Sequence, residues 1–174
     1  MSKVLVTGGA GYIGSHTVLA LLQSGNDVIV VDNFSNSSAE SLNRVSRLAG
    51  RSTLVIEGNI TDEAKIEKIF VENIDISSVI HFAALQAVGE STQHPLKYYH
   101  NNVTGSVILL DAMQRAGVKN LVFSSSCTVY GEPEKVPISE NFPVGSVSSP
   151  YGRTKYMMEE IIEDYAKSDP AFCC

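Results

Sequence analysis

Long basic runs, long apolar runs and C-x-x-C pairs are all missing from this 174-residue sequence. Nucleic-acid binding requires a concentrated cationic surface, whereas the chain carries a net charge of −6, so we expect no nucleic-acid partner. No apolar stretch approaches the roughly 20 residues of a bilayer-spanning helix, so we expect no membrane partner. The three cysteines, Cys127, Cys173 and Cys174, make a poor disulfide framework, and we assign no metal ligands.

The two ends of the sequence carry separate expectations. The chain runs from Met1 almost directly into an apolar segment, with no charged region ahead of a long apolar stretch. We therefore expect no signal peptide and a cytoplasmic protein. At the other end, an Asp169-Pro170 turn precedes apolar residues, a pattern that usually opens a strand. We expect this strand to be interrupted at Cys174 and the chain to be shortened before a further domain.

Apolar runs of strand length alternate with segments of helical period along the chain. Apolar residues make up 44% and charged residues 18%, which favours one folded domain with a buried core. The runs expected as strands are 3–7, 27–32, 53–57, 78–83 and 120–125. The segments expected as helices are 12–24, 39–48, 62–72, 95–116 and 150–167. Because the strand runs are continuously apolar, we expect strands buried on both faces, in a doubly wound α/β fold with a parallel sheet.

Two of these helices show one apolar face. The expected buried face of the helix at 95–116 contains Val103, Val107, Leu110 and Met113. That of the helix at 150–167 contains Met158, Ile161, Ile162 and Tyr165.

A glycine-rich turn joins the first strand to the first helix. It satisfies G-x-x-G-x-x-G through Gly8, Gly11 and Gly14, and G-x-G-x-x-G when Gly9 replaces Gly8. Such a turn needs positive φ and close approach of the backbone, and the helix N-terminus that follows attracts phosphate groups. An ordinary glycine-rich turn is the alternative. The strand before it and the helix after it favour dinucleotide binding.

Asp32 ends the second strand run, where a carboxylate can accept both hydroxyls of an adenosine ribose. A carboxylate repels a 2′-phosphate, and no arginine follows at once, so NAD is favoured over NADP. The alternative is an aspartate that caps the loop at 33–38.

A serine run and a tyrosine–lysine pair suit proton transfer. Ser124, Ser125 and Ser126 follow the fifth strand, at the sheet edge where ligands bind. Tyr151 and Lys155, four residues apart, lie on one helix face. The ordinary tyrosine pKa of about 10 makes it a poor base, but a nearby ammonium and a cationic nicotinamide favour the phenolate. Taken singly, the pair suits a surface contact and the serines a strand end; together with the glycine turn they indicate removal of an alcohol proton.

Three stretches carry a resemblance to a known family: TGGAGYIGSH from Thr7, AVGES from Ala87 and FSSSCTVYG from Phe123. With the Tyr-x-x-x-Lys pair, they make the sequence similar to the extended short-chain dehydrogenase/reductase family over essentially its whole length. The resemblance implies a Rossmann-like NAD-binding domain over residues 1–174, followed in intact members by a smaller domain for the nucleotide sugar. It also implies a homodimer formed through the helices at 95–116 and 150–167.

Within that family, the sequence looks like members that interconvert UDP-glucose and UDP-galactose by transient NAD-mediated oxidation and reduction at sugar C4. The resemblance implies that Tyr151 is the base for the sugar 4-hydroxyl, and that Lys155 binds the nicotinamide ribose and stabilises the phenolate. It implies that Ser126 and Thr128 hydrogen-bond near the sugar or the tyrosine oxygen. The residues that it places in the cofactor site are Gly8, Gly11, Tyr12, Ile13, Gly14, Asp32, Asn33, Asn59, Ile60, Phe82, Ala83, Asn101, Ser124, Tyr151 and Lys155.

The sequence departs from the family pattern at two positions. Asn59 stands where an acid usually contacts the adenine amino group; asparagine keeps an acceptor without the charge. Gln86 stands where many of these enzymes have lysine near the cofactor riboses, so the positive field there is lost.

Other functions stay open. Related dehydratases and decarboxylases carry carboxylates at the positions of Cys127 and Thr128, and their absence favours epimerisation. The alternatives are a related enzyme acting on another nucleotide sugar, and a shortened NAD-binding module without catalysis. We do not expect the shortened chain to catalyse the reaction alone, because the resemblance places the uridine-binding wall in the missing part.

Overall fold

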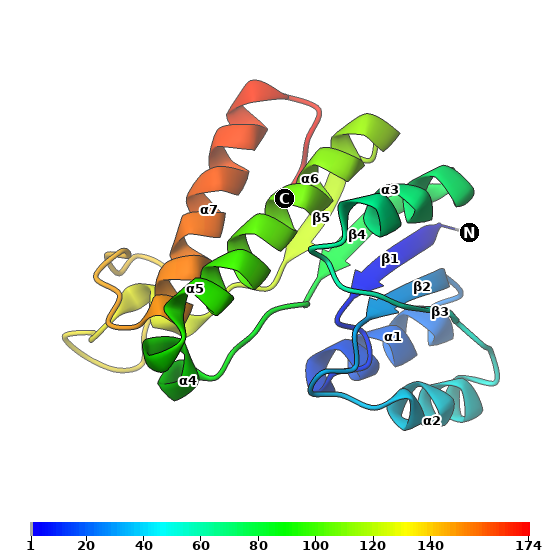
Figure 1. Ribbon diagram of the computed structural model, residues 1–174, viewed down its shortest axis with the longest axis horizontal. Coiled ribbons are helices and arrows are strands. Elements are labelled where there is room, and N and C mark those ends of the chain that lie inside the picture. Colours follow the sequence, from blue (N-terminus) through cyan, green and yellow to red (C-terminus); the bar gives the residue numbers. More distant parts are fainter. Residues whose placement is uncertain (1) are drawn as a thin grey trace.

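The structure, a computed structural model, describes residues 2–174 and contains one five-stranded parallel sheet (Figure 1). Its strands are β1 (Lys3–Thr7), β2 (Asp27–Asp32), β3 (Leu54–Glu57), β4 (Ile76–His81) and β5 (Asn120–Phe123). Their order across the sheet is β3-β2-β1-β4-β5, and every neighbouring pair is parallel. This order, which changes direction between β1 and β4, confirms the predicted Rossmann-like α/β fold.

Helices connect the strands and cover both faces of the sheet (Figure 1). They are α1 (Tyr12–Gln23), α2 (Ala39–Ala49), α3 (Glu63–Glu72), α4 (Val88–Gln93), α5 (Pro95–Tyr98), α6 (Gly105–Ala116) and α7 (Pro150–Ser168). A π-helical segment, η1 (Tyr99–Thr104), joins α5 to α6, and a 3-10 turn, η2 (Cys127–Tyr130), follows β5. Ser149 caps the N-terminus of α7. Its side chain accepts a 3.1 Å hydrogen bond from the Gly152 amide.

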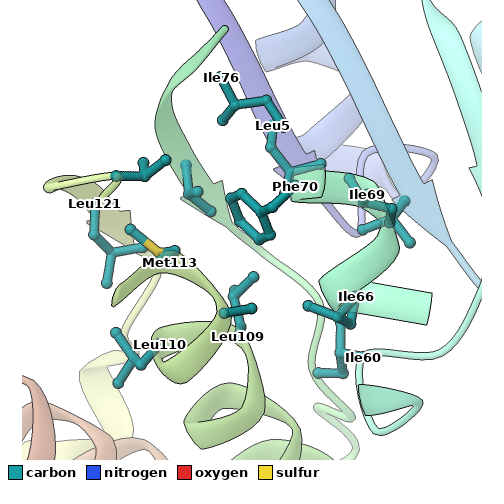
Figure 2. Packing of buried hydrophobic residues seen from close by; sticks show 14 of the residues in the cluster. Leu5, Ile60, Ile66, Ile69, Phe70, Ile76, Leu109, Leu110, Met113 and Leu121 are labelled. Carbon is teal, nitrogen blue, oxygen red and sulfur yellow. The ribbon is translucent and has the colours of Figure 1, made fainter. Parts of the chain in front are cut away.

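Side chains of the central strands alternate between two hydrophobic clusters, one on each face of the sheet. Val4 and Val6 of β1 pack with residues of α1 and α2. Leu5, between them, packs in the larger cluster with residues of α3, α6 and α7, part of which Figure 2 shows around Phe70 and Met113. Full burial of each large aliphatic side chain contributes about 1.5–3 kcal/mol, so these two layers hold the sheet and its helices together.

The outer strands do not match the expectation of burial on both faces. Leu54 of β3 is 52% exposed and Val122 of β5 is 58% exposed. The strands β1 and β2 are buried as predicted. The prediction was wrong for β3 and β5 because a continuous apolar run does not tell a central strand from an edge strand, and the flanking helices leave these edge side chains uncovered.

The single helix predicted over 95–116 is instead three consecutive segments, α5, η1 and α6. Of its predicted buried face, Val107 is 43% exposed, whereas the other predicted residues are buried or partly buried. Ser106 takes the buried place next to Val107 because its hydroxyl bonds His81 inside the protein. Apolar periodicity favours valine over serine for a buried position, so it assigned Val107 to the buried face in place of Ser106.

Two further segments complete the fold. The short helix α4 was not predicted, because six residues that include Gly89 carry no apolar period. Near the end of the described chain, Cys173 forms a parallel bridge with Asn120, and its amide donates to the Lys119 carbonyl at 2.8 Å. This bridge confirms the strand-like pattern predicted after the Asp169-Pro170 turn. Among residues 2–174, no helix combines the length and the apolar composition needed to cross a membrane.

Candidate cofactor and proton-transfer site

A cavity of about 470 Å³ lies at the carboxyl ends of the strands. Its walls come from the glycine turn after β1, the end of β2, the segments that follow β4 and β5, and the start of α7. Every residue that the sequence assigned to the cofactor site lines this cavity. Ligands of open parallel sheets bind at this place, where the strand order changes direction.

The glycine turn brings its backbone close to the floor of the cavity. Gly8 has φ +68°, and a Cβ there would lie 2.7 Å from the amide nitrogen of Ala83. A Cβ on Gly14 would overlap the Gly8 carbonyl oxygen. A Cβ on Gly9 would instead meet Val30 in the core, and Gly9 does not line the cavity. The G-x-x-G-x-x-G pattern, which starts at Gly8, is therefore the one that shapes the cavity.

The carboxylate of Asp32 is held by protein donors at the end of β2. Its Oδ2 accepts from the Ala10 amide at 2.9 Å, and its Oδ1 accepts from the Phe34 amide at 2.9 Å and the Ser37 hydroxyl at 2.8 Å. Asp32 thus caps the following loop, as the alternative prediction states, and also lines the cavity. A carboxylate offers about four acceptor sites, so about one is left for a ribose hydroxyl, where two hydroxyls were predicted.

Lys155 reaches from α7 to the end of β5. Its Nζ donates to the Ser124 carbonyl at 2.5 Å and lies 4.7 Å from the centre of the Phe123 ring. Lys155 is only 5% exposed, and this burial lowers the pKa of its ammonium to about 8, against the opposing attraction of Glu159. Tyr151, one helical turn earlier, is also buried and lines the same cavity. The predicted tyrosine–lysine pair therefore belongs to the cavity and is not a surface contact.

Ser126 and Thr128, the two hydroxyls predicted near the sugar or the tyrosine oxygen, are placed differently. Ser126 lines the cavity, whereas Thr128 does not. The Thr128 hydroxyl donates to the Ser126 Oγ at 2.9 Å. Thr128 therefore reaches the cavity only through Ser126, because η2 turns the chain away after the serine run.

Asn102 supports the site from inside the protein, and no sequence pattern singled it out. Its Oδ1 accepts from the Leu85 amide at 2.8 Å, and its Nδ2 donates to the Leu85 carbonyl at 2.9 Å. The same Nδ2 donates to the Thr154 hydroxyl at 3.1 Å, between Tyr151 and Lys155 on α7. One buried side chain thus ties the loop after β4 to the helix that carries the proton-transfer pair.

A second buried group that sequence reasoning missed is His81 at the end of β4. Its Nδ1 lies 2.5 Å from the Thr7 hydroxyl and its Nε2 lies 2.7 Å from the Ser106 hydroxyl. Ser106 donates onward to the Asn102 carbonyl, and Thr7 accepts from the Ala83 amide. Because each hydroxyl has one proton to give, the bonds run in one direction and fix the proton of His81 on Nε2.

Several residues that line the cavity were not assigned from sequence: Ser35, Asn36, Gly58, Ala84 and Leu85. They lie in loops or just after strands. Short polar and small residues in loops follow no period, so no pattern pointed to them. Only their position after a predicted strand could have indicated the cavity edge.

Several known proteins resemble this chain in sequence and in fold. A UDP-glucose 4-epimerase from Pasteurella multocida is 56% identical over 169 residues, which are 97% of this chain and 50% of that protein. One from Bacillus subtilis is 55% identical over 166 residues, which are 95% of this chain and 48% of that protein. The solved structure of UDP-glucose 4-epimerase from Bifidobacterium longum, in complex with NAD+ and UDP, matches 98% of this chain and 51% of its own, with a TM-score of 0.96 at 47% identity.

The chain spans about half the length of the curated relatives it matches. Residues 4–174 match the sequence model of one protein family, and this match covers nearly all of the residues that the structure describes. The parallel sheet, the glycine turn and the tyrosine–lysine pair lie within that match. On this evidence, the chain belongs to the NAD dependent epimerase/dehydratase family.

Proposed function

We propose that this chain is the NAD-binding half of an enzyme that interconverts UDP-glucose and UDP-galactose at sugar C4. One observation carries the proposal: the glycine turn at 8–14, Tyr151 and Lys155 all line one cavity. Oxidation of an alcohol requires a bound dinucleotide and a base for the alcohol proton. The glycine turn can bind the dinucleotide, and Tyr151 can accept the proton in the same cavity. The similarity to UDP-glucose 4-epimerases supports the substrate class. Residues 1–174 then form the cofactor domain, and a separate domain holds the sugar nucleotide.

The residues of the cavity fit NAD+. The turn at Gly8 and Gly14 leaves no space for side chains, so a pyrophosphate can lie against the backbone. Amides in the first turn of α1 have no acceptor within the helix and are free for the phosphates. The Asp32 carboxylate repels a 2′-phosphate, which favours NAD+ over NADP+. When bound, NAD+ supplies the acceptor for the hydride from sugar C4.

The chain's own residues handle the proton of the sugar 4-hydroxyl. The Tyr151 phenolate accepts that proton as the C4–H bond breaks, and the Lys155 ammonium stabilises the phenolate charge. With a pKa of about 8, Lys155 is charged at pH 7. An ammonium has three N–H donors and Lys155 gives one to Ser124, so two are left for ribose hydroxyls. The hydrogen-bonded pair of Ser126 and Thr128 orients the sugar hydroxyl.

The proposal includes a homodimer formed through the helical segments at 95–116, which are α5, η1 and α6, and through α7. The exposed Val107 on α6 supports it, since an apolar side chain gains stability when a partner covers it. Static light scattering on the purified chain tests this assembly. A dimer mass is the expected result, and a monomer at high protein concentration contradicts it.

The function is tested by calorimetric titration of the chain with NAD+ and NADP+, followed by addition of UDP-galactose. We expect NAD+ to bind at least about tenfold more tightly than NADP+, because the 2′-phosphate meets Asp32. Substitution Gly14→Ala should weaken NAD+ binding, whereas Gly89→Ala, at an open position away from the cavity, should not. A chain that binds neither nucleotide refutes the proposal.

The addition of nucleotide sugars distinguishes the proposed enzyme from the alternative functions. Conversion of UDP-galactose to UDP-glucose supports an epimerase that is active without the second half of its relatives. Faster conversion of a UDP-N-acetylhexosamine than of UDP-galactose indicates a related enzyme that acts on another nucleotide sugar. Binding of NAD+ without turnover of any sugar nucleotide is the outcome expected both of the cofactor half tested alone and of an NAD-binding module without catalysis.

A further inference from the structure

Two consecutive residues just after β5 form hydrogen bonds with two residues that lie one turn apart on α7. The Ser124 carbonyl accepts from the Lys155 ammonium at 2.5 Å. The Ser125 hydroxyl donates to the Glu159 carboxylate. Lys155 is buried, Glu159 is half-buried, and Ser125 lines the cavity. This clamp fixes a carboxylate beside the ammonium on the same helix face.

The carboxylate is close to the ammonium without touching it. Among the ion pairs of residues 2–174, none joins Lys155 to Glu159 within 4 Å. A direct pair would occupy N–H groups of the ammonium, whereas attraction over a longer distance leaves them free. Because Ser125 holds the carboxylate, Lys155 keeps two donors for a ligand in the cavity.

The ammonium needs such a partner because it is buried. Burial disfavours the charged form and lowers the pKa of Lys155, and Glu159 is the neighbour whose charge opposes that change. The titratable groups on the elements that pack against α7 and Lys155 are His81, Glu90, Lys97, Tyr98, Tyr99, His100, Cys127 and Tyr130. Glu90 is paired with Lys97 at 2.6 Å, and burial keeps His81 uncharged. Glu159 is therefore the carboxylate that acts on the ammonium.

We propose that Glu159 is a positioning residue for Lys155: tethered by the Ser125 hydroxyl, its carboxylate stabilises the buried ammonium from the same helix face and leaves its remaining donors to the cavity. The catalytic meaning of this arrangement rests on the function proposed above. The electrostatic arrangement itself is a property of the chain without ligand. It is therefore measurable without activity.

The test is an NMR titration of the full chain labelled at the lysine Cε, with the Lys155 signal assigned by its loss in Lys155→Arg. We expect a midpoint near 8 for Lys155 in the unsubstituted chain. Glu159→Gln keeps the size and a hydrogen-bonding group but removes the charge, so the midpoint should fall by about one pH unit. Ser125→Ala keeps the charge but releases the carboxylate, which then pairs directly with the ammonium, so the midpoint should rise.

Glu160→Gln is the matched control, because Glu160 is exposed and bonds the Tyr156 hydroxyl at 2.8 Å instead. Its Lys155 midpoint should equal that of the unsubstituted chain. An unchanged midpoint in Glu159→Gln, or the same fall in Glu160→Gln, overturns the proposal, and an unchanged midpoint in Ser125→Ala overturns the tether. The other lysine signals report whether each variant is folded; if Glu159→Gln is not, Ser125→Ala decides the outcome.

A parallel NAD+ titration separates this proposal from the function proposed above. Failure of the unsubstituted chain to bind NAD+ would refute the cofactor function and leave the lysine midpoints interpretable. Normal NAD+ binding with an insensitive Lys155 midpoint would refute only the role of Glu159.

Discussion

The buried histidine His81 makes a quantitative prediction about stability and pH. It is 3% exposed, and burial, with a smaller contribution from the Lys155 charge, lowers its pKa from 6.5 to about 3. In the unfolded chain, His81 binds a proton near its ordinary pKa, whereas the folded protein resists protonation. The unfolded state therefore binds more protons below pH 6.5, and stability is lost as the pH falls from there toward 3.

The magnitude follows from the two pKa values. Linkage gives a loss of about 2 kcal/mol in the free energy of unfolding between pH 7 and pH 5, a range in which most carboxylates stay ionised. That loss is large beside the 5–15 kcal/mol that typically stabilises a domain. Urea unfolding followed by circular dichroism at pH 7, 6 and 5 measures it.

The variant His81→Gln, which cannot titrate, isolates the effect. At pH 7 we expect it to be less stable by about 1–3 kcal/mol, because the Thr7 and Ser106 hydroxyls lose a partner. Its stability should then change little down to pH 5, so the two curves converge. The exposed His94 serves as the control, since His94→Gln should keep the slope of the unsubstituted chain. Equal slopes for His81→Gln and the unsubstituted chain would refute the reasoning.

Three other substitutions have defined outcomes. Gly14→Ala places a Cβ against the Gly8 carbonyl, so the dissociation constant for NAD+ in calorimetric titration should rise at least about tenfold. Asp32→Ala removes an acceptor from two amides and a hydroxyl, and should lower the free energy of unfolding by about 1–3 kcal/mol as well as weakening NAD+ binding. Asn102→Ala releases Leu85 from α7, and should lower the free energy of unfolding in urea by about 1–3 kcal/mol; unchanged stability would show that these bonds contribute little.

The parts of the site that the sequence predicted are those with short-range causes. The turn from Gly8 to Gly14 needs residues without side chains within one loop, and the spacing of Tyr151 and Lys155 needs only the pitch of a helix. Both signals are complete within seven residues of sequence. The parallel sheet also follows, since apolar strand runs alternate with helices along the chain, whereas its strand order is known only from the structure.

The parts that the sequence did not predict have long-range causes. Asn102 bonds Leu85 and Thr154, which lie 17 and 52 residues away, and His81 bonds Thr7, which lies 74 residues away. A polar residue on an apolar helix face can be exposed or can meet a buried partner, and the sequence does not say which. Exposure of β3 depends equally on which helices reach over it.

The π-helical segment η1 decides where two neighbouring asparagines point. Asn101 lines the cavity, while Asn102 is buried against Leu85 and Thr154. A π turn holds one residue more than an α turn, so η1 amounts to a single insertion in an otherwise regular helix. Deleting one residue from 99–104 would make the helix regular but would rotate the preceding part by roughly 100° relative to α6. The regular helix would then present other side chains to the cavity. The site therefore requires the π-helical segment.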